Sequence, residues 1–157
     1  MNSAGSVLIV IGSILAASIF QLLPMKGYFL LWKPNFLFLI AMAWIIFSPG
    51  QRGIGFAAFL GLLADLIFRA PIGLHILLFG VVGAIPLLVT RWLVYFTILH
   101  RCLFIGLLVV VAELVGNMLF GIWGVPTHYG AIPMKALISA SMWPLIDQLL
   151  AKVTLDY

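Results

Sequence analysis

The chain has 157 residues and a formal net charge of +4, with 65% hydrophobic residues, only 8% Asp, Glu, Lys or Arg, and a mean hydropathy of +1.28. Soluble domains carry about 25% charged residues, and disordered chains combine low hydrophobicity with high charge, so this composition excludes both classes. It predicts an integral membrane protein, in which about 20 apolar residues per crossing leave room for about six helices.

Six apolar runs follow one another along the chain and predict a single domain, an all-α, polytopic membrane protein with six transmembrane helices. The segment 28–32, just before the second run, is apolar and aromatic. It is expected either to lie in the membrane interface or to form a broken half of the second helix. Pro34 fits the first turn of that helix, where its missing N–H costs nothing. The predicted helices span 6–24, 34–48, 53–69, 73–90, 102–123 and 132–150.

The basic residues leave the orientation nearly undecided. Six crossings put both termini on one side of the membrane, and the positive-inside rule compares the Lys and Arg residues of the two sides. Each side has four. His100 and the α-amino group weakly favour termini in the cytoplasm. The residues counted are Arg52, Arg91, Arg101 and Lys152 on the side of the termini, and Lys26, Lys33, Arg69 and Lys135 on the other.

Asp65 is the sharpest polar feature, because a charge at the centre of a membrane helix costs about 2.5–3.5 kcal/mol on insertion scales. Arg69, four residues later, lies on the same helix face and is expected to pair with Asp65. Lys33 is expected at the same membrane level if the second and third helices form a hairpin. Two interpretations stay open: a polar centre that binds a partner or ligand, or a local ion pair that orients the third helix.

Glu113 lies about halfway along the fifth run, with Asn117 one turn later and the small residues Ala112 and Gly116 beside them. This pattern predicts a tight seam between helices, in which small residues allow close approach and polar residues form interhelical hydrogen bonds. A proton relay and a substrate contact are the alternatives. His75 opens the fourth run, and a lone His is usually a structural hydrogen-bonding residue.

Other functional classes find little support in the residues. No two His residues have the spacing of metal ligands, so neither a metal nor another cofactor is expected. The P-loop, HExxH and GxSxG motifs of enzymes do not occur. Lys and Arg are scattered, which argues against nucleic-acid binding. Small residues recur four apart in several runs, a pattern that supports close packing within the chain or between two copies of it.

Three motifs resemble the MreD family of bacterial rod shape-determining proteins. KPNFLFLIAMAW at 33–44 is similar to the family's basic-Pro-Asn opening of helix two. GFAAFLGLLADLIFRAPIGLHILLF at 55–79 resembles its Gly-rich third helix with an Asp, followed by a Leu-Gly step. MWPLIDQLLAK at 142–152 resembles its closing helix, marked by Trp143 and Pro144, although the family's basic tail is reduced to one Lys.

The resemblance implies a non-catalytic scaffold in the bacterial inner membrane that supports cell shape and lateral peptidoglycan synthesis in the rod system, or elongasome. It implies MreC as the main partner and, through MreC, the wider complex of MreB, RodA and a penicillin-binding protein, in contact with membrane lipid. It also implies both termini in the cytoplasm. The implied six-helix fold is similar to the substrate-binding subunits of ECF transporters.

The sequence therefore predicts two groups of site residues. Candidates for a polar centre that binds a partner are Lys33, Pro34, Asn35, Gly61, Asp65, Arg69, Gly73 and His75. Candidates for the helix seam are Ala112, Glu113, Gly116, Asn117, Trp143 and Pro144. One alternative is a small-molecule-binding transporter subunit of the ECF substrate-component type, with a polar cavity formed by Glu113, Asn117 and His75. A small membrane enzyme acting on lipid is the other.

Overall fold

The computed structural model describes residues 3–93 and 95–155, and this part of the chain is all-α, which confirms the all-α part of the predicted fold class. The described residues form seven α-helices and one short 3-10 helix. In chain order these are α1 (Ser3–Leu22), α2 (Tyr28–Trp32), α3 (Phe36–Phe47), α4 (Ile54–Phe68), α5 (Leu74–Leu93), α6 (Ile98–Ile122), η1 (Tyr129–Ala131) and α7 (Ile132–Leu155).

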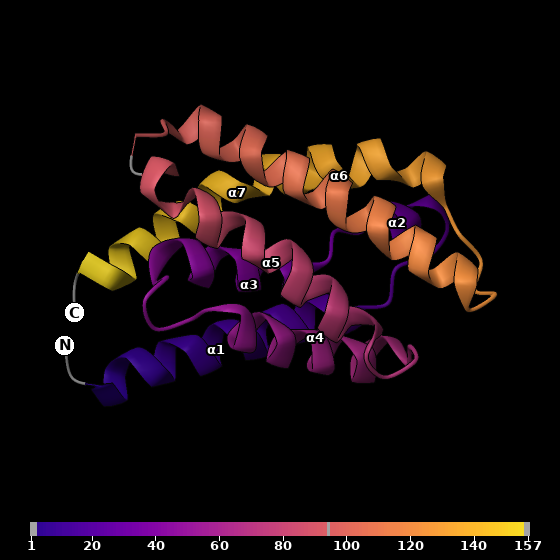
Figure 1. Ribbon diagram of the computed structural model, residues 1–157, viewed down its shortest axis with the longest axis horizontal. Helices are drawn as coiled ribbons and strands as arrows, with labels where there is room; N and C mark the ends of the chain where they lie inside the picture. The colour runs from indigo at the N-terminus through magenta and orange to yellow at the C-terminus, as the bar shows by residue number, and fades with distance from the viewer. Residues whose placement is uncertain (1–2, 94, 156–157) are drawn as a thin grey trace.

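The long helices run roughly along the longest axis of the molecule (Figure 1). The start of α1, the end of α7 and the connection between α3 and α4 lie at one end (Figure 1). The connections α1–α2, α4–α5 and α6–α7 lie at the opposite end (Figure 1). We call this opposite end, formed by residues 23–35, 69–73 and 123–131, the distal end.

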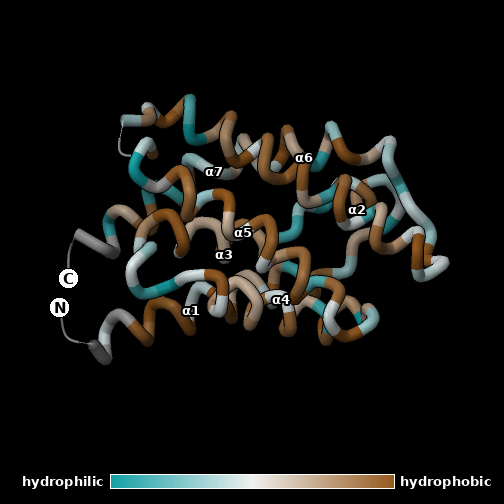
Figure 2. Tube along the Cα trace, viewed as in Figure 1, coloured by the Kyte–Doolittle hydropathy of each residue, from teal (hydrophilic) through white to brown (hydrophobic). Residues whose placement is uncertain are grey.

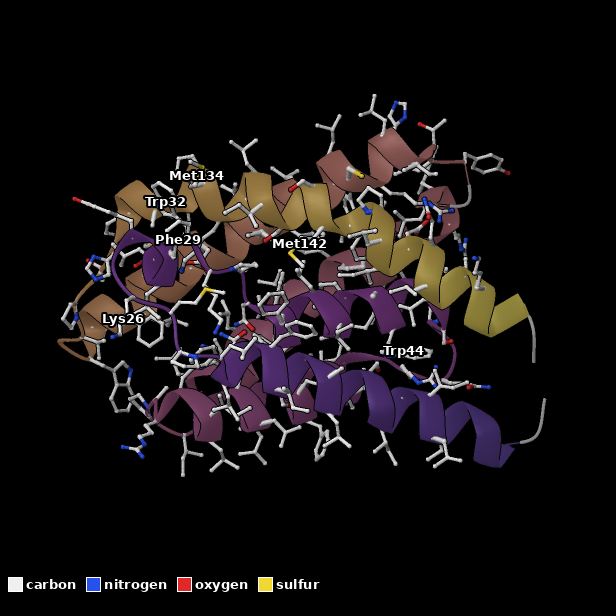
Figure 3. All side chains as sticks on the ribbon, turned by 180° about the vertical axis from the view of Figure 1, so that it is seen from behind. Lys26, Phe29, Trp32, Trp44, Met134 and Met142 are labelled. Carbon is white, nitrogen blue, oxygen red and sulfur yellow. The ribbon has the colours of Figure 1, made fainter. Side chains whose placement is uncertain are left out.

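The helix α3 occupies the centre of the bundle. Of its 12 residues, eight are buried, and it packs against α1, α4, α5 and α7. A helix that is apolar on all sides is expected to be surrounded by protein in this way. Trp44, labelled in Figure 3, connects α3 to α1 by a hydrogen bond. Its indole N–H donates to the hydroxyl of Ser13 at 2.8 Å. The guanidinium of Arg52 lies 4.2 Å from the centre of the same ring, a cation–π contact.

The second predicted helix is divided at Lys33, Pro34 and Asn35. Lys33 has the extended backbone (φ −59°, ψ 123°) that a following proline imposes. Asn35 caps α3, since its side-chain oxygen accepts the N–H of Phe38 at 3.1 Å. Pro34 therefore precedes the cap of α3. The prediction that it stands in the first turn of the helix is wrong. The segment 28–32 becomes the separate five-residue helix α2.

The helix α2 lies against α7 at the distal end. Phe29 and Trp32 of α2 are seen beside Met134, which belongs to the first turn of α7 (Figure 3), and contacts between the two helices agree with this view. The other helix ends differ from the predicted ranges by up to five residues. The largest difference is at α7, which continues to Leu155.

The surface of the bundle is largely apolar. Figure 2 shows hydrophobic residues along most of the helices, with hydrophilic residues gathered mainly at their ends and connections. The stretch Tyr28–Phe47 and the helix Ile98–Ile122 are long and apolar enough to cross a membrane. Val7–Leu22, Ile54–Phe68 and Leu74–Val89 are shorter apolar helices. Exposed apolar area on this scale would be a liability in water, whereas lipid accommodates it.

Candidate functional site

Asp65, near the end of α4, is almost fully buried at 1% exposure and fixes the turn into α5. Its Oδ2 accepts the backbone N–H of Gly73 at 2.8 Å, and its Oδ1 accepts the backbone N–H of His75 at 2.9 Å. The ring Nδ1 of His75 lies 2.8 Å from the same Oδ1. The two backbone donors belong to the start of α5, where a helix has N–H groups without internal partners. The carboxylate thus caps α5 from a neighbouring helix.

Arg69 does not pair with Asp65, contrary to the prediction. The helix α4 ends at Phe68, and Arg69 adopts a left-handed backbone (φ 52°) with its N–H bonded to the carbonyl of Asp65. The rule for residues four apart requires the helix to continue through both positions, and here it has ended. The side chain of Arg69 is exposed and makes neither a hydrogen bond nor an ion pair within the described part of the chain.

Gly61 brings the start of α5 close enough to α4 for these bonds to form. A Cβ atom placed on Gly61 would collide with the carbonyl oxygen of His75 and would lie 2.7 Å from the Cα of Ile76. Only a residue without a side chain permits this backbone approach. Gly73, with φ +106°, supplies the second unusual backbone conformation of the turn.

Lys33 joins the end of α1 to the start of α3, and within the described residues it forms neither a hydrogen bond nor an ion pair with Asp65. It is 9% exposed, and its ammonium donates to the carbonyls of Gln21 at 2.7 Å and Leu23 at 2.8 Å. Carbonyls at the end of a helix lack helical partners, so the ammonium satisfies acceptors left by α1. The side-chain oxygen of Gln21 accepts the N–H of Phe36 at 3.0 Å, which ties the same two segments together.

Glu113 and Asn117 connect α6 to α7 and to the loop between them. The carboxylate of Glu113 pairs with the ammonium of Lys135 in α7 at 2.9 Å. Asn117 donates to the carbonyl of Glu113 at 2.8 Å and accepts the N–H of His128 at 3.1 Å. At Gly116 an added Cβ would meet a methyl of Leu78 at 3.5 Å, so α6 packs against α5 on this face.

Trp143 and Pro144 stand apart from these residues, in the second half of α7. Trp143 is fully buried in the core, and Pro144 lies inside the helix. The indole nitrogen of Trp143 and the hydroxyl of Ser139, one turn earlier, have no hydrogen-bond partner among the described residues.

A cavity of about 610 Å³ at the distal end brings the two predicted groups of residues together. Its walls come from the end of α1, from α2, α3 and the end of α4, and from α5, α6 and α7. From the predicted polar centre it takes Lys33, Asn35, Arg69 and His75, and from the predicted seam Ala112, Glu113, Gly116 and Asn117. The remaining candidates, Pro34, Gly61, Asp65, Gly73, Trp143 and Pro144, do not line it.

Three polar lining residues were not singled out from the sequence: Gln21, His128 and Lys135. Lys135 did carry a signal, because a charge early in an apolar run requires a partner and the preceding run contains an acid of opposite sign. Gln21 and His128 carried none: Gln21 accepts a backbone N–H of Phe36, and His128 donates its own backbone N–H to Asn117, and only the folded chain brings these groups near each other.

The comparisons with known proteins agree with each other. The family model described as rod shape-determining protein MreD matches residues 1–153. A protein of Haemophilus influenzae, described as rod shape-determining protein MreD, is 27% identical to the chain over 141 residues. That match covers 87% of this chain and 85% of the relative. No solved structure matches the chain.

Proposed function

This chain belongs to the MreD family of rod shape-determining proteins, and from that premise we propose that it is a membrane scaffold which binds MreC. The membership confirms the resemblance seen in the motifs. It also makes the chain a polytopic membrane protein of cell-shape determination that is not an enzyme. The proposal adds the partner, the site that holds it and a place in the elongasome beside MreB, RodA and a penicillin-binding protein.

The observation that carries the proposal is the turn between α4 and α5, which Asp65 holds by hydrogen bonds. Three interactions with the Asp65 carboxylate hold this turn, and Arg69 projects from it, exposed and unpaired within the described residues. Helices associate in lipid through packing and polar contacts. A guanidinium on a pre-ordered turn can pair with an acidic group of MreC at little entropic cost, because the turn needs no further ordering.

The arrangement of the ends puts both termini on one side of the membrane, and we propose that this side is the cytoplasm. The start of α1 and the end of α7 lie together, and the distal end lies opposite (Figure 1). Termini in the cytoplasm would turn the distal end toward the periplasm. The α4–α5 turn, from which Arg69 projects, would then face the part of MreC that leaves the membrane on that side.

The test is affinity purification of the tagged chain from detergent, with partners identified by mass spectrometry. We expect MreC to be recovered with the wild type, and Arg69→Ala to reduce its recovery. The control is Arg91→Ala, which removes an exposed charge from the last turn of α5, at the end opposite the distal end. Asp65→Ala, which leaves three donors unsatisfied, is expected to lower MreC recovery and to disturb rod shape.

Two results would contradict the proposal at different levels. Normal recovery of MreC and normal rods in both distal-end variants would exclude the α4–α5 turn as the binding site. Absence of MreC from the wild-type purification would exclude the scaffold itself.

One observation favours a second candidate, a small-molecule-binding subunit of the ECF substrate-component type. The cavity of about 610 Å³ has the size of a small-molecule site, and Glu113, Asn117 and His75 all line it. The same purification separates the candidates, because a transport subunit would bring an ATPase module with it and a scaffold would bring MreC.

A further inference from the structure

The distal cavity has an apolar floor, and polar side chains line both its interior and its mouth. Phe38, Leu78, Phe79, Val109 and Ala112 line it and are each at most 6% exposed, so they form its deepest wall. Among its polar lining residues, Arg69 and His128 are exposed and mark the mouth, whereas Lys33, His75 and Asn117 are buried. An occupant that matches this mixed lining has an apolar part and a polar part.

The charge of the lining is positive. Lys33, Arg69 and Lys135 face a single lining acid, Glu113. Glu113 is already paired with Lys135 at 2.9 Å, which leaves Lys33 and Arg69 as cations without a lining counterion. The polar part of the occupant is therefore expected to be an anion.

Lys33 is the strongest indication of a missing anion. It is 9% exposed, yet its two hydrogen-bond acceptors are neutral carbonyls, which leave one donor of the ammonium unused. Within residues 3–93 and 95–155 the acids are Asp65, Glu113 and Asp147, and their partners are His75, Lys135 and Arg101. A buried cation without an opposite charge is costly.

Asn35 provides a further donor beside this cation. Its oxygen is occupied by the N–H of Phe38, and its amide nitrogen has no partner in the described structure. Asn35 and Lys33 line the same cavity, so an ammonium hydrogen and an amide N–H are both available to an anionic group.

The size of the cavity argues against a small free anion. A water molecule takes about 30 Å³ in the liquid, so a phosphate ion would leave much of the 610 Å³ and its apolar floor filled with water. The cavity lies among the connections at one end of the helices, which is the level of lipid head groups in a membrane protein. Basic pockets between membrane helices bind such head groups.

We propose that the distal cavity binds an anionic phospholipid, with the phosphate beside Lys33 and Arg69 and an acyl chain against Phe38 and Phe79. This proposal shares Arg69 with the proposed MreC site, but it is tested without MreC, on the purified chain alone. A bound lipid would occupy the cavity at the distal end, which also contains the α4–α5 turn.

The test is native mass spectrometry of the purified full-length chain in detergent, titrated with dioctanoyl phosphatidylglycerol. Dioctanoyl phosphatidylcholine and inorganic phosphate are titrated in parallel. We expect phosphatidylglycerol to bind about tenfold more tightly than either, because it alone combines a net negative charge with acyl chains.

Three variants locate the lipid. Arg69→Gln removes an exposed cation of the mouth and is expected to weaken phosphatidylglycerol binding about tenfold. Ala112→Leu fills the floor and is expected to weaken it similarly. Lys26→Gln removes the same charge from a distal-end residue that is exposed and does not line the cavity, and should change nothing (Lys26 is labelled in Figure 3).

Equal lipid binding by Arg69→Gln and Lys26→Gln would overturn the proposal, because the surface charge alone would then explain the attraction. Inorganic phosphate binding as tightly as phosphatidylglycerol would also overturn it, since the site would be one for a free anion. Thermal unfolding in lipid-free detergent checks that each variant is folded. Gly116→Ala, whose added Cβ makes an ordinary contact, replaces Ala112→Leu if that variant fails to fold.

Discussion

At Gly61 the backbones of α4 and α5 meet with no side chain between them, so Gly61→Ala is expected to destabilise the fold. The added Cβ would collide with the backbone at His75 and Ile76 and force α5 to shift. Overpacking of this kind costs about 1–3 kcal/mol, measurable as a lower melting temperature in detergent. The control is Gly80→Ala, whose Cβ would lie 3.7 Å from a methyl of Ile54, an ordinary contact on the same helix pair. Equal melting temperatures would contradict the prediction.

Asp65→Asn keeps the size of the side chain and removes one acceptor. The amide oxygen can still accept from His75, but the amide NH2 then faces the N–H of Gly73, and two donors oppose each other. An unsatisfied buried donor costs about 1–3 kcal/mol, so we expect a lower melting temperature in thermal unfolding. Asp147→Asn is the comparison, because its partner Arg101 is 27% exposed and water can replace part of that pair. A smaller effect at Asp65 than at Asp147 would refute the assignment.

The partner of Asp65 shows where sequence reasoning stops at the residue scale. The acid itself could be singled out, because any charge within an apolar run demands an explanation. Its partner could not, since the spacing to Arg69 assumes a helix that in fact ends at Phe68. The true partners, Gly73 and His75, come within reach only because α5 folds back against Gly61.

At the scale of elements, two ion pairs hold α6 and α7 together. Arg101 and Asp147 pair at 3.1 Å toward one end of the hairpin, and Glu113 and Lys135 pair at 2.9 Å toward the distal end. The sequence placed the apolar runs, because hydropathy is a property of a continuous window. It could not pair the charges, nor show that seven helices and their loops line one cavity, because both depend on how distant segments pack.

We predict that Glu113 and Lys135 stabilise the fold through their ion pair, and not only through the presence of one acid and one base. Exchanging the two charges tests this. Glu113→Lys and Lys135→Glu each place like charges together and should lower the melting temperature. The double variant restores opposite charges and should recover most of the loss. A half-buried pair is worth about 1 kcal/mol, and the double-mutant cycle isolates that coupling. Additive losses would show that the 2.9 Å contact does not contribute to stability.

At the scale of the whole molecule, the fold puts both chain ends on the same side of the membrane but does not show which side that is. Figure 1 puts the first residues of α1 and the last of α7 at the same end. The basic residues remain balanced between this end and the distal end, so the positive-inside rule gives no preference. Cytoplasmic termini are part of our proposal, and labelling of exposed loop residues measures the orientation directly.

The proposed topology can be tested with two single-cysteine variants. Cys102, the one cysteine of the chain, is first replaced by Ser to remove background labelling. Lys26→Cys then reports on the distal end, and Gln51→Cys reports on the α3–α4 connection at the opposite end, both at exposed positions. With cytoplasmic termini, a membrane-impermeant maleimide labels position 26 in intact spheroplasts and position 51 only after permeabilisation. The reverse pattern would turn the distal cavity and the Arg69 turn toward the cytoplasm and would contradict the proposed topology.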